Sequence, residues 1–269
     1  MTGINKAVVL VPSILINLER LISDFEPRAW FLGCRWSFAA RTPVALAEYE
    51  LSEPWPEFAA RLSRFSGIQL EFHCFDEEDA IVRAKLGQSI VVAVDSFELP
   101  YRPAYRRVHS ARTVVIEAID EDAGMAMISD VWMPAYRGPV TLDALDRARR
   151  SSVPRDDDRE PLFAGKPLNA KWWAVSPVEP RMASATAEAA LLEAATEAHT
   201  TDSASAMEEF CKDALQSLSS PLPQSFEARR AAALLLRAEI GLRAYLLRLL
   251  DASAGALRDT LFAAELQCW

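Results

Sequence analysis

The chain has 269 residues, of which 51% are hydrophobic and 25% are charged, and its formal net charge at pH 7 is −9. This composition supplies enough apolar mass for a folded core and excludes a chain that is disordered throughout. The acidic balance argues against a nucleic-acid-binding protein, in which a basic face supplies most of the affinity, and no apolar run reaches the roughly 18 residues of a membrane span.

The first part of the chain has the pattern of a mixed α and β domain. A β-branched run at residues 7–11 predicts a strand, and leucines at helical spacing predict a helix over residues 13–25. A second short helix is predicted at residues 54–65, followed by an alternating strand at 68–72 and a further helix at 76–86.

The strongest strand signals come next. The apolar run 90–94, closed by Asp95, predicts a central strand, and residues 113–119 and 125–130 predict two more. The acidic turn at residues 120–124 contains a glycine, so the last two strands are expected to form an antiparallel hairpin. Thr141 is then predicted to cap a helix over residues 142–150.

The composition changes abruptly at residue 151. We predict an α+β domain over residues 1–152, a linker or surface loop over 153–180, and an all-α helical domain over 181–269. The leucine-rich helix predicted within the last domain leaves two alternatives open, namely packing onto its own α+β domain or formation of a homodimer.

The remaining sequence signals bear on location and cofactors. The four cysteines are scattered, which predicts separate reduced thiols in a cytoplasmic protein. The N-terminus has no secretory cleavage signal. No glycine-rich phosphate loop and no metal-binding motif occurs, so neither a metal nor another cofactor is expected.

Few residues could carry covalent chemistry. His109 lies just before a strand, and a histidine there with an aspartate on the antiparallel neighbour is typical of the base and orienting group of a triad. Asp95 and Asp130 each end an apolar strand, although such carboxylates equally often cap turns. Cys34, beside an arginine in an aromatic segment, is either the nucleophile or a buried packing residue.

Short motifs along most of the chain resemble the butirosin biosynthesis protein H-like family from antibiotic gene clusters. They are Asn17–Arg20, Leu32–Phe38, Leu99–Arg102, His109–Arg112 and Ser129–Asp130, together with a helical tail. That family is similar to papain-like cysteine peptidases, and its best-known member moves an acyl group from a carrier-protein thioester onto an amine. The resemblance implies a papain-like first domain with a central antiparallel sheet.

The same resemblance implies a role in the biosynthesis of a nonribosomal peptide or aminoglycoside-like antibiotic. The expected activity is acyl or aminoacyl transfer or release, by an acyltransferase or hydrolase. The expected partners are an acyl- or peptidyl-carrier protein and a small-molecule substrate, with neither nucleic acid nor membrane.

The chain departs from the family at the residues that would react. Asp130 matches the orienting aspartate, but the histidine of the family falls at Arg112 and its cysteine falls near Ser13 to Asn17. Arginine stays protonated at working pH and cannot accept a proton, so an ion pair between Arg112 and Asp130 is expected.

Three interpretations follow from this departure. In the first, His109 acts as the base, with Cys34 or Ser13 as the nucleophile. In the second, covalent chemistry is lost and the fold is a degenerate accessory protein that uses Arg112 to hold an anionic ligand. In the third, a different reaction occurs in the same cleft.

The substrate-binding candidates are Arg112, Asp95, Tyr101 and Arg102. All the interpretations expect the Asp130 carboxylate in an open cleft, within reach of an imidazole or guanidinium from the neighbouring strand.

Overall fold

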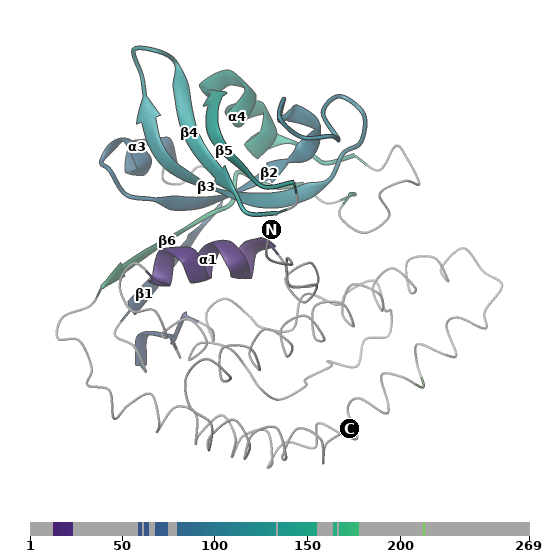
Figure 1. Cartoon of the computed structure of the whole chain (residues 1–269). Coiled ribbons are helices and arrows are strands. Elements are labelled where there is room, and N and C mark those ends of the chain that lie inside the picture. The colour runs from purple at the N-terminus through teal and green to yellow at the C-terminus, as the bar shows by residue number, and fades with distance from the viewer. Residues whose placement is uncertain are drawn as a thin grey trace, which may run out of the picture. The chain divides into compact units, whose positions relative to one another are not determined.

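The computed structural model describes residues 13–23, 59–60, 62–64, 68–74, 80–132, 134–154, 164–165, 167–177 and 212. The helices and strands named here belong to one compact unit, which comprises Pro12–Trp30 and Ile68–Glu179 (Figure 1). In chain order they are α1 (Ser13–Ser23), β1 (Ile68–His73), α3 (Ala80–Lys85), β2 (Ile90–Asp95), the 3₁₀ turn η4 (Ser96–Glu98), β3 (Ala111–Asp120), β4 (Met125–Asp130), β5 (Tyr136–Thr141), α4 (Leu142–Arg150) and β6 (Trp172–Pro177).

The strands form one six-stranded sheet in the order β1-β6-β2-β3-β4-β5, and every neighbouring pair is antiparallel. The central antiparallel sheet with helices that was predicted for the first domain is therefore confirmed. Strand β2 is buried along its whole length because the apolar run 90–94 packs on both faces of the sheet.

The helices cover both faces of this sheet (Figure 1). Helix α1 packs against β3, β2 and β6, whereas α3 and α4 pack against the other face. The main apolar core lies under α3 and α4. It contains the even-numbered residues of β2 and β3, such as Val92 and Val114, together with Leu145 of α4. Successive strand residues point to opposite faces, so odd-numbered residues at the start of β3 face α1.

Local hydrogen bonds stabilise the turn between β3 and β4 and the start of α4. The Asp120 carboxylate accepts a hydrogen bond from the Ala123 N–H at 3.0 Å, and Gly124 has a φ of 63° that suits the left-handed turn position. The Thr141 hydroxyl accepts from the Ala144 N–H at 3.3 Å, as expected for the predicted N-cap of α4. These short-range interactions explain why β3, β4 and α4 were predictable.

Two strands differ from the sequence prediction. Strand β6 lies inside residues 153–180, which were predicted as a linker or surface loop, and it pairs with both β1 and β2. Its apolar residues fill an interior position of the sheet, where Trp172 is fully buried. Strand β5 was not predicted because Gly138 and Pro139 disfavour strands. It lies at the edge of the sheet, where a proline is tolerated.

Several predicted elements lie outside the described residues. These are the strand at residues 7–11 and, apart from Lys212, the helical domain over 181–269. Within the predicted helix 54–65, the described residues 59–60 and 62–64 are helical. A search of the described residues for a helix of the length and hydropathy needed to cross a membrane finds none.

Candidate functional site

The Asp130 carboxylate lies at the centre of a buried polar cluster at the end of β4. Its Oδ2 atom accepts hydrogen bonds from the Tyr101 hydroxyl at 3.1 Å, from Arg102 Nη1 at 3.3 Å and from Arg112 Nη1 at 3.2 Å. Its Oδ1 atom accepts from the Trp132 N–H at 3.0 Å. The side chain of Asp130 is fully buried, and those of Arg102 and Arg112 are 4% and 13% exposed. The expected guanidinium partner is therefore present, but the carboxylate itself is closed to solvent.

The two arginines have further partners that hold them in this cluster. Arg102 Nη1 also donates to the backbone carbonyls of Trp132 at 3.2 Å and Pro134 at 2.8 Å. Arg112 Nε donates to the Ser96 hydroxyl at 2.6 Å. Two guanidinium groups and one carboxylate give the cluster a net charge of +1, and burial of such charges is tolerated only when they are hydrogen-bonded.

The surroundings shift the pKa values of two groups in the cluster. Burial raises the pKa of Tyr101 well above its usual value, and the negative charge of Asp130 raises it further. The phenol therefore stays protonated and acts as a hydrogen-bond donor. Burial lowers the pKa of Arg102, and the nearby positive charge of Arg112 lowers it further, while Asp130 opposes both effects. The guanidinium groups of arginine nevertheless remain charged at physiological pH.

His109 is held by a different carboxylate, that of Asp95. His109 Nδ1 and Asp95 Oδ2 are 2.6 Å apart, and the same oxygen accepts from the Ser151 hydroxyl at 2.6 Å. Asp95 Oδ1 accepts from the backbone N–H groups of Phe97 and Ser110, both at 3.0 Å. The imidazole stacks on the Phe97 ring with centroids 4.0 Å apart, and its side chain is 14% exposed.

This arrangement gives Asp95 both roles that the sequence left open. It caps the turn η4 with one oxygen and orients an imidazole with the other. A histidine held through Nδ1 by a buried carboxylate is the arrangement of a general base with its orienting group. His109 is thus paired with Asp95, on the strand antiparallel to β3, and not with Asp130.

Ser13 lies at the first position of α1, on the other face of the sheet. Its hydroxyl oxygen is 3.1 Å from both the backbone nitrogen and the side-chain oxygen of Thr113. The Asn17 amide donates to the Thr113 carbonyl at 3.0 Å and to the Thr113 hydroxyl at 2.9 Å. Because Thr113 faces α1, its neighbour Arg112 faces the α3 and α4 side. The structure therefore does not bring Ser13 to the Arg112–Asp130 pair.

The remaining candidates complete this comparison. Tyr101 and Arg102 both contact Asp130, although the sequence offered them only as substrate-binding residues. Ser96 and Ser151, which contact Arg112 and Asp95, were not foreseen, because the signal for them lies in the fold and not in a motif. Cys34 lies outside the described residues. Among the residues described, no group of three or more His, Cys, Asp or Glu side chains is placed to hold a metal ion.

Comparison with known families identifies one matching segment. Residues 19–131 match the family model described as "Butirosin biosynthesis protein H, N-terminal", which confirms the resemblance over that part of the chain. The match begins within α1, after Ser13, and ends just after Asp130, so it includes both Asp95 and Asp130 but not Ser151, Trp132 or Pro134. A search of curated proteins gives no match to this chain.

Proposed function

We propose that the protein acts in antibiotic biosynthesis as a papain-like accessory protein that binds an acyl- or peptidyl-carrier protein without covalent catalysis. The proposal is supported by the butirosin-type match over residues 19–131 together with the Arg112–Asp130 ion pair. The family resemblance places a histidine where this chain has Arg112. A permanent cation at that position cannot take a proton from a nucleophile, so the pair serves binding and stability and not proton transfer.

The ligand proposed for this cluster is an anionic group on the carrier-bound molecule, either a carboxylate or the phosphate of the phosphopantetheine arm. Arg112 donates from Nε to Ser96 and from Nη1 to Asp130, and among the described residues its Nη2 has no hydrogen-bond partner and can donate to a ligand. The net charge of +1 in the cluster favours an anion, and guanidinium groups bind carboxylate and phosphate oxygens strongly.

The test is titration of acylated carrier proteins against the full-length protein. We expect saturable binding that Arg112→Gln weakens by about tenfold or more, whereas Arg147→Ala, which removes a half-exposed guanidinium from α4, has no effect. Arg112→Lys retains the charge and should recover part of the affinity. Equal binding by wild type and Arg112→Gln, with both proteins folded by circular dichroism, would refute the proposal.

A second candidate function is acyl transfer with His109 as the base. The observation in its favour is the 2.6 Å contact between His109 Nδ1 and the buried Asp95 carboxylate. The sequence offered either Cys34 or Ser13 as the nucleophile, and Cys34 lies outside the described residues. This hypothesis predicts that transfer from an acylated carrier protein to an amine is lost in His109→Ala and in Cys34→Ala. It also predicts a reduced rate in Asp95→Asn. Activity that survives both alanine substitutions would eliminate it.

A further inference from the structure

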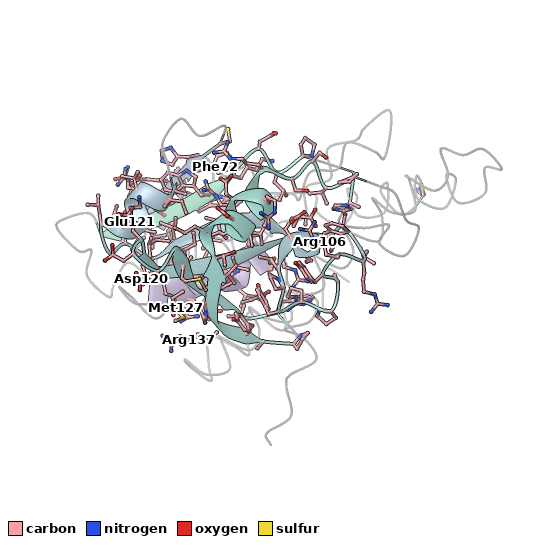
Figure 2. The ribbon with its side chains drawn as sticks, turned by 90° about the horizontal axis from the view of Figure 1, so that it is seen from above. Phe72, Arg106, Asp120, Glu121, Met127 and Arg137 are labelled. Atoms are coloured by element: carbon pink, nitrogen blue, oxygen red, sulfur yellow. The ribbon has the colours of Figure 1, made fainter. Side chains whose placement is uncertain are left out.

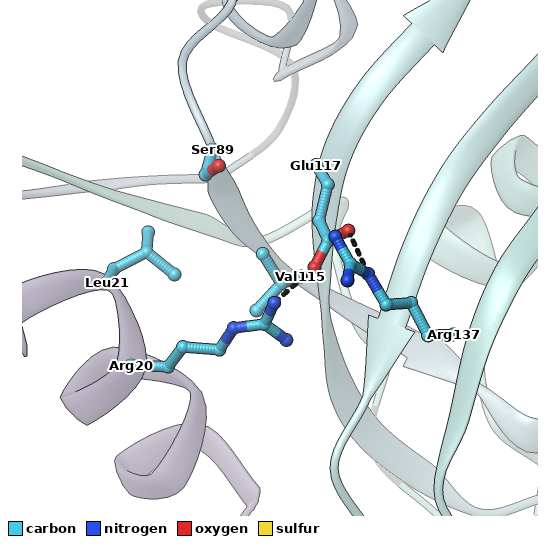
Figure 3. Close-up of a pocket in the computed structure, with 6 residues that line it drawn as sticks. All are labelled: Arg20, Leu21, Ser89, Val115, Glu117 and Arg137. Atoms are coloured by element: carbon cyan, nitrogen blue, oxygen red, sulfur yellow. Dashed lines mark hydrogen bonds and ion pairs between the residues drawn. The ribbon is translucent and has the colours of Figure 1, made fainter. Parts of the chain in front are cut away.

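A polar pocket lies between α1 and the sheet (Figure 3). Its volume is about 210 Å³, and it is lined by Arg20 and Leu21 of α1, Ser89, Val115 and Glu117 of β3, and Arg137 of β5. Ligand sites for whole drug-sized molecules usually exceed about 300 Å³, so this pocket suits a head group whose remainder extends into solvent.

The strand register builds the wall of this pocket. Val115 is paired with Ser129, and Ser129 is paired with Arg137, so the three residues form a row across β3, β4 and β5. Arg20 reaches this row from α1 and donates to both the Ser129 hydroxyl and the Glu117 carboxylate. The pocket is therefore bounded by rigid elements and not by loops alone.

A β-bulge interrupts β3 at the pocket residue Glu117. The register between β3 and β4 shifts between Ile116 and Ala118, which leaves Glu117 as the extra residue. Both Ile116 and Ile119 pack against the core under α3 and α4, as the shifted alternation requires. The alternation of residues 113, 115 and 117 already points Glu117 toward α1, and the bulge changes the facing of the residues that follow it, so that Ile119 packs against the core.

Glu117 holds two guanidinium groups, one on each carboxylate oxygen. Oε1 accepts from Arg20, and Oε2 accepts from Arg137 Nε at 2.8 Å (Figure 3). The Glu117 side chain is 13% exposed, whereas Arg20 is 38% and Arg137 is 72% exposed. Within the described part of the chain, the terminal nitrogens of Arg137 and the Ser89 hydroxyl have no hydrogen-bond partner.

We propose that this pocket binds the oxyanion head group, carboxylate or phosphate, of a small molecule. The two arginines outweigh Glu117 and give the pocket a net charge of +1, while Glu117 fixes the orientation of both. The terminal nitrogens of Arg137 and the Ser89 hydroxyl donate to the oxyanion. This proposal does not depend on the carrier-protein role.

The chain contains a matched control for this site. Glu98 holds Arg106 and Arg147 in the same way, with Arg106 Nη1 at 3.2 Å from one oxygen and Arg147 Nε at 3.1 Å from the other. Glu98 is also 13% exposed, and Arg147 is 51% exposed. Figure 2 shows Arg106 well away from Arg137, so the two arginine pairs can be tested separately.

The experiment is titration of the full-length protein with sodium phosphate and, separately, with sodium acetate at constant ionic strength. Binding is followed by the NMR signals of the arginine Nε–H groups. We expect saturable shifts of Arg137 and Arg20 in the millimolar range, and no saturable shift of Arg147. A preference for phosphate would identify phosphate esters as ligands, and a preference for acetate would identify carboxylic acids. Saturation of neither probe would overturn the proposal.

Variants that change the charge of the pocket provide a second test. Arg137→Ala should weaken binding by about tenfold, whereas Arg147→Ala should leave it unchanged. Glu117→Gln raises the net charge of the pocket to +2 and should tighten binding by roughly threefold or more. Weaker anion binding by Glu117→Gln, or an equal loss in Arg137→Ala and Arg147→Ala, would overturn the assignment. Thermal unfolding of each variant verifies that it is folded.

Discussion

Replacement of Asp130 by asparagine should destabilise the protein more than removal of any other single charge on the sheet. Asp130→Asn retains the size of the side chain but removes the negative charge that Arg102 and Arg112 share. Both guanidinium groups contact the same carboxylate oxygen, at 3.3 and 3.2 Å, so the variant leaves two like charges buried together. Breaking a buried pair in this way costs about 3–5 kcal/mol of the free energy of unfolding.

The two arginines differ in how they can respond to this substitution. Arg102 is 4% exposed and is also held by the backbone carbonyls of Trp132 and Pro134, so it cannot easily reach water. Arg112 is 13% exposed, and among the described residues its one other partner is Ser96. Relaxation of Arg112 toward solvent should therefore keep the loss near the lower end of the range, at about 3 kcal/mol.

Urea unfolding followed by circular dichroism measures this loss. The matched control is Asp146→Asn, which removes an exposed carboxylate that pairs with Arg150 at 2.9 Å. Both side chains of that pair are more than half exposed, so its loss should cost less than about 0.5 kcal/mol.

A double-mutant cycle with Arg112→Gln separates the pair from its surroundings, and its coupling energy should be about 1–3 kcal/mol. A loss in Asp130→Asn no larger than in the control, or additive effects in the cycle, would refute this reasoning.

Three further outcomes are expected. Folding raises the pKa of Tyr101 from 10.0, so the protonated phenol contributes its full stabilisation below pH 10. Above pH 10 this contribution to the free energy of unfolding declines by about 1.4 kcal/mol per pH unit. Urea unfolding at pH 9 and pH 11 should show this extra decline in wild type but not in Tyr101→Phe. Gly138→Ala should lower the free energy of unfolding in urea by about 1–3 kcal/mol, because a Cβ there would lie 2.6 Å from the Tyr136 hydroxyl. The same substitution should carry no such penalty in a Tyr136→Ala background, and an equal penalty in both backgrounds would contradict the clash. Thr141→Ala should cost about 1 kcal/mol in thermal unfolding through loss of the cap on the Ala144 N–H, whereas an unchanged melting temperature would show that the cap is immaterial.

The sequence was most informative where the structure depends on local interactions. Strands β2, β3 and β4 follow from continuous apolar runs, and the turn and cap residues fix the hairpin and α4. Strand β6 was missed because its neighbours in the sheet, β1 and β2, are distant in sequence, and a short apolar run after a charged segment does not reveal such pairing. Strand β5 was missed because Gly138 and Pro139 are tolerated only through its position at the edge.

The candidate site was predictable in part. The family resemblance placed Arg112 where the family has a histidine paired with Asp130, so an ion pair between them was expected, and the structure contains it at 3.2 Å. The sequence did not show which aspartate pairs with His109. The segment after η4 is irregular and returns to the end of β2, where the Ser96 N–H donates to the Ser110 carbonyl at 3.0 Å. A local sequence pattern does not predict such a return. The hydrogen bond from Ser151 to Asp95 likewise joins residues that are far apart in the sequence. The bulge at Glu117, beside the pocket on the α1 face, leaves no signal in a single sequence.

The central claim is that Arg112 replaces a proton-accepting residue, so that the protein binds carrier-linked acyl groups without becoming acylated. The most direct test is the intact mass of the protein after incubation with an acylated carrier protein under conditions where the two bind. The account predicts an unchanged mass at all times. A mass increase equal to the acyl group, located by peptide mapping on Cys34 or Ser13, would contradict it.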